Sequence, residues 1–424
     1  MKHIRTRLFG ITLSFIMLIS LLPVTALAGE AAWNGTTVDT SWYNDSATEF
    51  TISDSADLAG LAKLVNAGNN FSGKTIKLGN DIDLGGKEWT PIGNKTNKFE
   101  GVFDGNKNTI SNLFINSPTK SDIGLFGFTQ SGEVKNFILK NAKVTGYLDV
   151  GAVAGTPYTS KYSNIDVTGL IQVEGFSYVG GAFGKNAYAN LTDVNVTGDE
   201  GSYVKAESGY YRTYLGGLVG FMGEGNFTVS DCDVKVDVTG STCDVGGILG
   251  ILHYGNTMTN CTYTGSLALT DPDADVGAEF GALVGVIYNQ QNQTTTITDC
   301  SAMVTKAISG NQDVTNTITP HGDFYNDVTA NNGGTVSVSA TINGTTVTVD
   351  NYVAKIGDQG YTTLAAAIDV ANQTTGGSNV TVTITKSGSY DPFTITRSNV
   401  TVQAAEGVEA TFNVSASKDR QYQW

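Results

Sequence analysis

The chain has 424 residues, of which 51 are glycine and only 15 % are charged. Its 25 basic and 40 acidic residues give a net charge of −15. This charge argues against nucleic acids and anionic membrane surfaces as partners. The glycine content and the sparse charge agree with a strand-rich extracellular protein.

The N-terminus has the pattern of a secretory signal peptide. Lys2, Arg5 and Arg7 precede an apolar run over residues 8–22, and the small residues of Ala26-Leu27-Ala28 follow it. The run is too short to favour a membrane-spanning helix, although an uncleaved anchor is the alternative. We expect residues 1–28 to be removed. The mature chain would then carry 22 basic and 40 acidic residues, a net charge of −18, and no membrane-spanning segment.

The segment over residues 29–74 contains a predicted amphipathic helix that begins near Ser53–Ser55. Its apolar positions fall on one helical face: Leu58, Leu61, Leu64 and Val65. A helix of this kind can cover the open end of a stacked β-structure, which would otherwise expose strand edges and apolar core. We therefore expect an N-terminal cap helix.

Short strand-like phrases follow the helix. They are T-I-K-L at Thr75, D-I-D-L at Asp81, W-T-P-I-G at Trp89, F-E-G-V-F-D-G at Phe99 and T-I-S-N-L at Thr109. Thr75-Ile76 and Thr109-Ile110 lie 34 residues apart. We expect this region to form the first one or two coils of a repeated structure.

A glycine-anchored phrase then occurs six times: I-G-L-F-G, V-G-A-V-A-G, V-G-G-A-F-G, L-G-G-L-V-G, V-G-G-I-L-G and F-G-A-L-V-G. The first glycines, at 124, 151, 180, 216, 246 and 281, are separated by 27, 29, 36, 30 and 35 residues. A period in this range indicates an array of stacked units that bury their apolar faces against one another. A β-propeller blade would need a longer repeat.

Each repeat continues with an Asn or Asp residue and then an apolar residue. These apolar residues are Phe137, Ile165, Val194, Cys232, Cys261 and Cys300. After Cys232 the chain alternates between apolar and charged residues with the period of a strand that buries one face. Residues 75–306 are therefore predicted to form a right-handed parallel β-helix with one coil per repeat. The apolar residues would form an inward column, and the Asn and Asp residues would form a ladder at a turn.

The phrases D-I-D-L, W-T-P-I-G, F-E-G-V-F-D-G-N and T-I-S-N-L, followed by V-G-G-I-L-G repeats, resemble bacterial surface proteins that carry the GLUG motif. The resemblance covers roughly residues 50–305. It implies an extracellular β-helical module of adhesin-like proteins, which also occurs upstream of immunoglobulin A peptidase domains. It supplies no catalytic residues, and the chain lacks the H-E-x-x-H motif of a zinc peptidase.

The C-terminal part is predicted to begin with a linker and β-hairpin over residues 307–350, because Asn343-Gly344 is a strong hairpin signal. Residues 351–424 then give a helix near 361–371 followed by strands. This order resembles the opening of a pectate-lyase-like β-helix, of which only the first strands are present. We expect the sequence to be the N-terminal part of a longer chain.

The chain offers little catalytic chemistry, and we assign no catalytic residue. Asp271, Asp273 and Asp275 have a spacing that could hold Ca²⁺, but the glycine and glutamate of a calcium-binding loop are missing. A solvated insertion loop is the alternative. Tyr203, Tyr210, Tyr211 and Tyr214 crowd the longest insertion and could bind a ligand through their flat rings. They could equally be half-buried strand residues.

These features predict a secreted or cell-surface module that is not an enzyme. It would act as a rigid, monomeric spacer within a longer chain and bind a glycan or a host or matrix protein. The alternatives are a carbohydrate-active β-helix, either a lyase or a hydrolase, and the N-terminal accessory region of a larger surface enzyme such as a peptidase.

The four cysteines are Cys232, Cys243, Cys261 and Cys300. An even number in an exported chain favours disulfides. Three of them, however, occupy the inward column, where their Cβ vectors would run parallel to one another rather than converge. We therefore predict four free thiols.

Overall fold

The computed structural model describes residues 31–207, 213–272, 279–289, 293–322, 324–326, 335–350, 353–357, 359–361, 363–374 and 379–412. Within these ranges the regular structure is mostly β-strand, with two helices, α2 (Ser55–Asn66) and α3 (Leu364–Gln373). The predicted signal peptide, Tyr210, Tyr211, Asp273 and Asp275 lie outside the described residues. The prediction of an all-β protein is confirmed.

The largest sheet, here called the first sheet, runs from residue 49 to residue 350. Its strands are β1 (Glu49–Ile52), β2 (Thr75–Leu78), β3 (Ile82–Asp83), β4 (Val102–Asp104), β5 (Thr109–Asn116), β7 (Glu133–Thr145), β10 (Lys161–Gly175), β13 (Asn190–Gly198), β14 (Tyr203–Glu207), β17 (Thr228–Ser230), β18 (Asp233–Lys235), β19 (Asp237–Ser241), β22 (Thr257–Thr259), β23 (Thr262–Leu269), β26 (Thr294–Ser309), β27 (Gln312–Asp313), β29 (Thr335–Ile342) and β30 (Thr345–Asp350).

Two further sheets contribute strands to the coils from residue 126 onward. A five-stranded sheet contains β8 (Leu148–Val150), β11 (Ser177–Gly180), β15 (Tyr214–Gly216), β20 (Asp244–Gly246) and β24 (Phe280–Gly281). A seven-stranded sheet, here called the outer sheet, contains β6 (Phe126–Gln130), β9 (Ala154–Tyr158), β12 (Phe183–Asn186), β16 (Val219–Met222), β21 (Leu249–His253), β25 (Val284–Asn289) and β28 (Phe324–Asn326).

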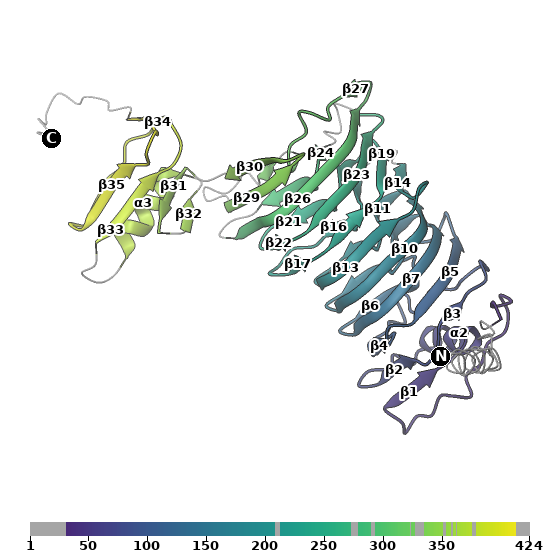
Figure 1. Cartoon of the computed structure of the whole chain (residues 1–424). Helices are drawn as coiled ribbons and strands as arrows, with labels where there is room; N and C mark the ends of the chain where they lie inside the picture. Colours follow the sequence, from purple (N-terminus) through teal and green to yellow (C-terminus); the bar gives the residue numbers. More distant parts are fainter. Residues whose placement is uncertain are drawn as a thin grey trace, which may run out of the picture. The chain divides into compact units, whose positions relative to one another are not determined.

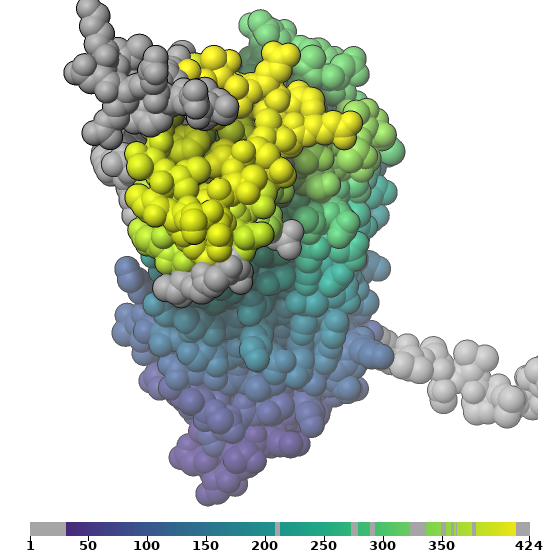
Figure 2. Space-filling view, turned by 90° about the vertical axis from the view of Figure 1, so that its left-hand side faces the viewer, coloured from purple at the N-terminus to yellow at the C-terminus, as the bar shows by residue number. Residues whose placement is uncertain are grey.

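Successive repeats pair in parallel and in register, so that the chain forms a solenoid-like stack (Figure 1). In the five-stranded sheet, Val179 pairs with Val150 and with Leu215, and Leu215 pairs with Val245. The glycine phrases therefore stand directly beside one another. Between the purple end and the green region, the colours in Figure 2 follow one another as continuous layers.

The inward column of apolar residues is buried as the alternation predicts. Ile165 pairs with Phe137 and Val194, and Cys232, Cys261 and Cys300 continue the buried positions. Together with the apolar residues of the other two sheets they form one hydrophobic cluster that extends from Trp33 to Ile342. Each coil is too thin to bury its apolar face alone, so burial depends on both of its neighbours.

The glycines of the repeated phrase stand where two backbone segments approach too closely for a side chain. A Cβ atom on Gly246 would lie 2.0 Å from the carbonyl oxygen of Leu249. At Gly180, Gly216 and Gly281 the corresponding distance to a carbonyl oxygen would be between 2.1 and 2.2 Å. The repeated glycine is therefore a steric requirement of the corner between the five-stranded and outer sheets.

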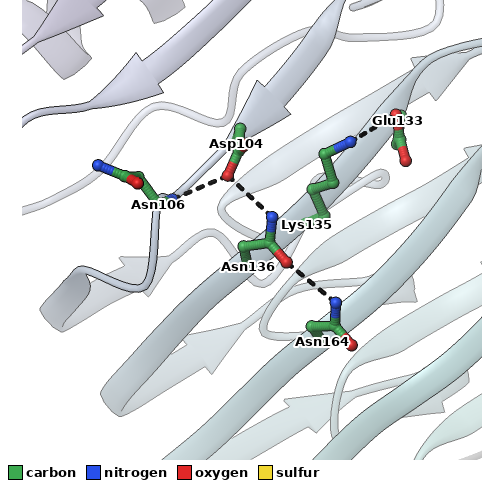
Figure 3. Close-up of polar contacts among 6 residues, drawn as sticks. All are labelled: Asp104, Asn106, Glu133, Lys135, Asn136 and Asn164. Carbon is green, nitrogen blue, oxygen red and sulfur yellow. Dashed lines mark hydrogen bonds and ion pairs between the residues drawn. The ribbon is translucent and has the colours of Figure 1, made fainter.

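The Asn and Asp residues before the inward column occupy a left-handed bend. Their φ angles lie between 51° and 60° in Asn136, Asn164, Asp193, Asp231, Asn260 and Asp299. Asn and Asp tolerate this region better than other residues with a side chain. The Nδ2 group of Asn164 donates to Oδ1 of Asn136 at 3.0 Å, and Nδ2 of Asn136 donates to Oδ1 of Asp104 at 3.0 Å (Figure 3). The predicted ladder is present in these coils.

The N-terminal helix α2 lies beside the first strands (Figure 1). The side chain of Asp54 accepts a hydrogen bond from the backbone N–H of Asp57 and so caps the helix. Leu58, Leu61 and Val65 are fully buried in the main hydrophobic cluster. This helix and its apolar face agree with the prediction from sequence.

The register of the first coil differs from what the phrase spacing suggests. Thr75 pairs with Val102, whereas Ile82 pairs with Ile110. Thr75 and Thr109 therefore occupy different positions around the coil, although both begin a T-I phrase. The strand register is set by which residues face inward, and the similarity of the two T-I phrases does not determine it.

The hairpin around Asn343-Gly344 is present, with φ angles of 48° and 82° at the two turn residues. Strands β29 and β30 are antiparallel, and β29 also pairs in parallel with β26. The stack of the first sheet thus continues past residue 306, the predicted end of the repeats.

The region from residue 353 to residue 412 has its own hydrophobic cluster, to which Leu364, Ala367 and Ile368 of α3 contribute. Its strands are β31 (Ala354–Ile356), β32 (Gln359–Tyr361), β33 (Val380–Ile384), β34 (Gly388–Tyr390), β35 (Val400–Ala404) and β36 (Ala410–Phe412). β33 pairs in parallel with β35, and β34 pairs in parallel with β36. A helix followed by parallel strands is the order expected from sequence.

Replacement of Gly246 by Ala tests the steric requirement at the corner. The added methyl group overlaps the Leu249 carbonyl oxygen, so we expect the free energy of unfolding to fall by roughly 3 kcal/mol or more. Gly388→Ala is the matched control, because no atom lies closer than 4.0 Å to its added methyl group. Urea unfolding of both variants measures the difference, and equal stability would contradict this explanation of the motif.

The four cysteines are free and buried in the structure. The thiols of Cys232, Cys261 and Cys300 each lie within 3.1–3.2 Å of a carbonyl oxygen two residues earlier. We expect mass spectrometry of protein that is unfolded and alkylated without reduction to find four modified thiols. A bridge between Cys232 and Cys261 would show that the register of the inward column is wrong.

Candidate functional site: an aromatic face with a carboxylate pair

The solvent side of the outer sheet and its corner carry a continuous group of aromatic side chains. The group, here called the aromatic face, consists of Tyr178, Tyr214, Phe221, His253, Tyr254 and Tyr288. All six side chains are half-buried. They come from successive coils, because β11, β16, β21 and β25 are neighbours in the stack or belong to adjacent repeats.

Phe221 contacts both Tyr178 and Tyr214 in the aromatic face. The rings of Tyr178 and Tyr214 stack with centroids 5.7 Å apart and an interplanar angle of 12°. The Phe221 ring lies 5.3 Å from the first and 5.7 Å from the second.

His253 continues the face toward the next coil. Its ring lies 4.9 Å from Phe221 and 4.9 Å from Tyr288, with which it pairs in register. Burial lowers the pKa of His253 to about 4, so the imidazole is neutral at pH 7. Its Nδ1 atom is buried without a hydrogen-bond partner in the structure. The Tyr254 hydroxyl donates to Glu224.

Lys185 lies over two rings of the aromatic face. Its Nζ atom lies 5.6 Å from the centroid of the Tyr178 ring and 5.3 Å from that of Phe221. Desolvation raises the pKa values of Asp122 and Asp149, and the positive charge of Lys185 opposes this effect in part. A lysine held over aromatic rings is attracted by their negative faces.

Asp122 and Asp149 occupy equivalent positions in neighbouring coils, because each directly precedes one of the two bridge partners Ile123 and Val150. Desolvation, followed by the negative charge of Asp122, raises the pKa of Asp149 to about 7. Desolvation also raises the pKa of Asp122, whose Oδ1 accepts a hydrogen bond from Thr156 at 2.6 Å. Asp149 is therefore largely protonated well below pH 7.

The structure brings together only part of the predicted tyrosine group. Tyr214 belongs to the aromatic face, whereas Tyr203 lies on β14 of the first sheet and donates to Glu174 at 2.6 Å. Desolvation and this hydrogen bond raise the pKa of Tyr203 to about 12. Tyr210 and Tyr211 lie outside the described residues.

The predicted cation-binding residues are not tested by the structure. Asp271 is exposed, and Asp273 and Asp275 lie outside the described residues. Across the described part of the chain, no three His, Cys, Asp or Glu side chains are grouped so that they could hold a metal ion.

The carboxylate pair was missed by sequence reasoning, although one signal for it was present. The residues directly before the glycine phrases share one column: Asp122, Asp149, Tyr178, Tyr214, Asp244 and Glu279. In this column two carboxylates are followed by two tyrosines and then by two more carboxylates, which marks the corner that carries both groups.

Comparison with known proteins gives two partial relatives. Halomucin of Haloquadratum walsbyi is 36 % identical over 148 residues, which are 32 % of this chain and 2 % of halomucin. A putative Gly-rich membrane protein of Evansella cellulosilytica is 34 % identical over 114 residues, which are 26 % of this chain and 13 % of that protein. The match thus spans a small part of each relative. No family model matches the chain. No solved structure matches it.

Neither of the helices in the described ranges is long and apolar enough to cross a membrane.

The raised pKa of Asp149 predicts a contribution to stability that is lost as the pH rises. Between its ordinary value of 3.8 and about 7, the folded state holds a proton that the unfolded state has released, so raising the pH favours unfolding. The loss is complete above pH 7 and amounts to at most roughly 4 kcal/mol for a shift of this size. Asp149→Asn removes this component, because an amide stays neutral and Asn tolerates the φ angle of 56°.

Urea unfolding at pH 4.5 and pH 8 provides the measurement. The wild-type protein should lose more stability over this interval than Asp149→Asn does. Asp369→Asn, at an exposed position on α3, serves as the control and should behave as the wild type. An identical pH dependence in all three proteins would show that Asp149 is ionised in the fold.

Proposed function

We propose that this chain is a secreted or cell-surface module whose stacked coils form a rigid spacer that presents a ligand-binding face. The observation that carries the proposal is the hydrophobic cluster extending from Trp33 to Ile342. Because each coil is bonded to the next through whole strands, the stack resists bending. The names of the two partial relatives, a halomucin and a putative Gly-rich membrane protein, support a surface setting.

In this proposal the solenoid is a right-handed parallel β-helix of the GLUG type, and α2 is its N-terminal cap. Parallel pairing of β7, β10 and β13, the left-handed Asn/Asp bend and the glycine corner support it. The region from residue 353 to residue 412 would be the start of a second β-helix. The ligand-binding face is the aromatic face and not the tyrosine-rich insertion as a whole.

Export is the part of the proposal that can be tested first. The chain, produced with its own N-terminus in a bacterial host, should leave the cytoplasm and begin at Gly29 in N-terminal sequencing. Leu18→Arg should block export because it places a charge in the apolar run, whereas Thr6→Arg in the basic region should not. A full-length product retained in the cytoplasm would contradict the proposal.

A second candidate function is carbohydrate hydrolysis by the Asp122–Asp149 pair. The pKa of Asp149, about 7, favours it, because a general acid works best with a pKa near the operating pH. In this reading Asp149 would protonate the leaving oxygen and Asp122 would act as nucleophile or base.

Assay of the exported protein for new reducing ends on neutral and acidic polysaccharides tests this candidate. Turnover that Asp149→Asn abolishes and Asp369→Asn preserves would establish hydrolysis. The preparation is first shown to be folded by circular dichroism. If it then releases no reducing ends from any polysaccharide, the result contradicts hydrolysis and favours the non-catalytic proposal.

A further inference from the structure

The aromatic face has the dimensions of a strip and not of a pocket. Its rings advance from Tyr178 through Phe221 and His253 to Tyr288, with neighbouring centroids 4.9–5.3 Å apart. These steps are close to the spacing of roughly 4.8 Å between neighbouring strands. A ligand that contacts all four rings must therefore be extended along the stack.

The rings are held in place before any ligand arrives. They project from strands of two sheets, each strand paired with a neighbour on both sides, and Tyr178 has a φ angle of 54° that is unusual for a tyrosine. Lys185 lies over two of the rings. Aromatic side chains fixed in this way give contact area with little loss of conformational entropy.

A polar group accompanies the rings of the strip. The Nζ atom of Lys185 lies 5.6 Å from the centroid of the Tyr178 ring and 5.3 Å from that of Phe221, so an ammonium donor stands beside both rings. The strip thus combines flat apolar surfaces with a hydrogen-bond donor for a ligand hydroxyl group.

We propose that the aromatic face binds a neutral linear polysaccharide lengthwise, with its sugar rings on Tyr178, Tyr214 and Phe221 and its hydroxyl groups on Lys185. A sugar ring has an apolar C–H face that fits an aromatic ring and a rim of hydroxyl groups that suits such partners. The net charge of −15 disfavours polyanions, including nucleic acids and acidic polysaccharides. A protein partner would need a broader surface, about 800 Å² on each side.

This inference rests on the proposed function and names the ligand class of its binding face. Its test is native affinity electrophoresis of the exported full chain in gels that contain mixed-linkage β-glucan, glucomannan, xylan or polygalacturonate. We expect at least one of the three neutral polysaccharides to retard the protein, and polygalacturonate to leave its mobility unchanged.

Variants decide whether the aromatic face is responsible. Phe221→Ala and Tyr214→Ala should each weaken the affinity at least tenfold. Tyr203→Ala is the matched control, because it removes a half-buried tyrosine from a different sheet and should change the affinity less than twofold. Circular dichroism of each variant confirms folding, and Phe221→Trp should retain binding.

Three results would overturn the inference: no retardation by any neutral polysaccharide, equal weakening in Tyr203→Ala, or binding of polygalacturonate in preference to the neutral polymers. Capture of a protein by the same face, lost in Phe221→Ala, would also overturn it. The export assay is independent of these results, so failure of polysaccharide binding and failure of the surface role can be told apart.

Discussion

Parallel hydrogen bonding between equivalent strands of successive coils is the interaction on which the rest of this structure depends. It sets the register in which Ile165 lies beside Phe137 and Val194, and so it builds the buried column. It also brings two backbone segments so close at each corner that Gly246 and its counterparts cannot carry a side chain. The sequence repeats because this geometry repeats, and the length of each repeat varies with its loops.

The same register creates the candidate site. A position that recurs in every coil becomes a line of side chains on the surface, so a change at that position alters one point of the line without disturbing the core. Asp122 and Asp149 therefore stand together, and Tyr178 and Tyr214 stack in the coils that follow. Burial in the corner between two sheets then raises the pKa of Asp149, since its ionised form loses hydration there.

Much of the fold could be predicted from the sequence because its signals are local and repeated. The glycine spacing, the alternation after Cys232 and the capped helix at Leu58 each reflect one physical constraint at a known position. The register of the first coil could not be obtained in this way, since similar T-I phrases at Thr75 and Thr109 occupy different positions. The site could not be predicted because it depends on contacts between coils. Tyr203 and Tyr214 are close in the sequence and were therefore predicted to act together, but they lie on different sheets.

The central claim is that each repeat forms one coil in register with its neighbours. Lys140 and Met303 are exposed and lie five coils apart in one line, which passes through Thr168, Thr197, Lys235 and Thr264. Spin labels attached to cysteines at these two positions should be separated by roughly 24 Å, five times the strand spacing, with a narrow distribution. A broad distribution, or a mean distance above about 40 Å, would contradict the stacked register.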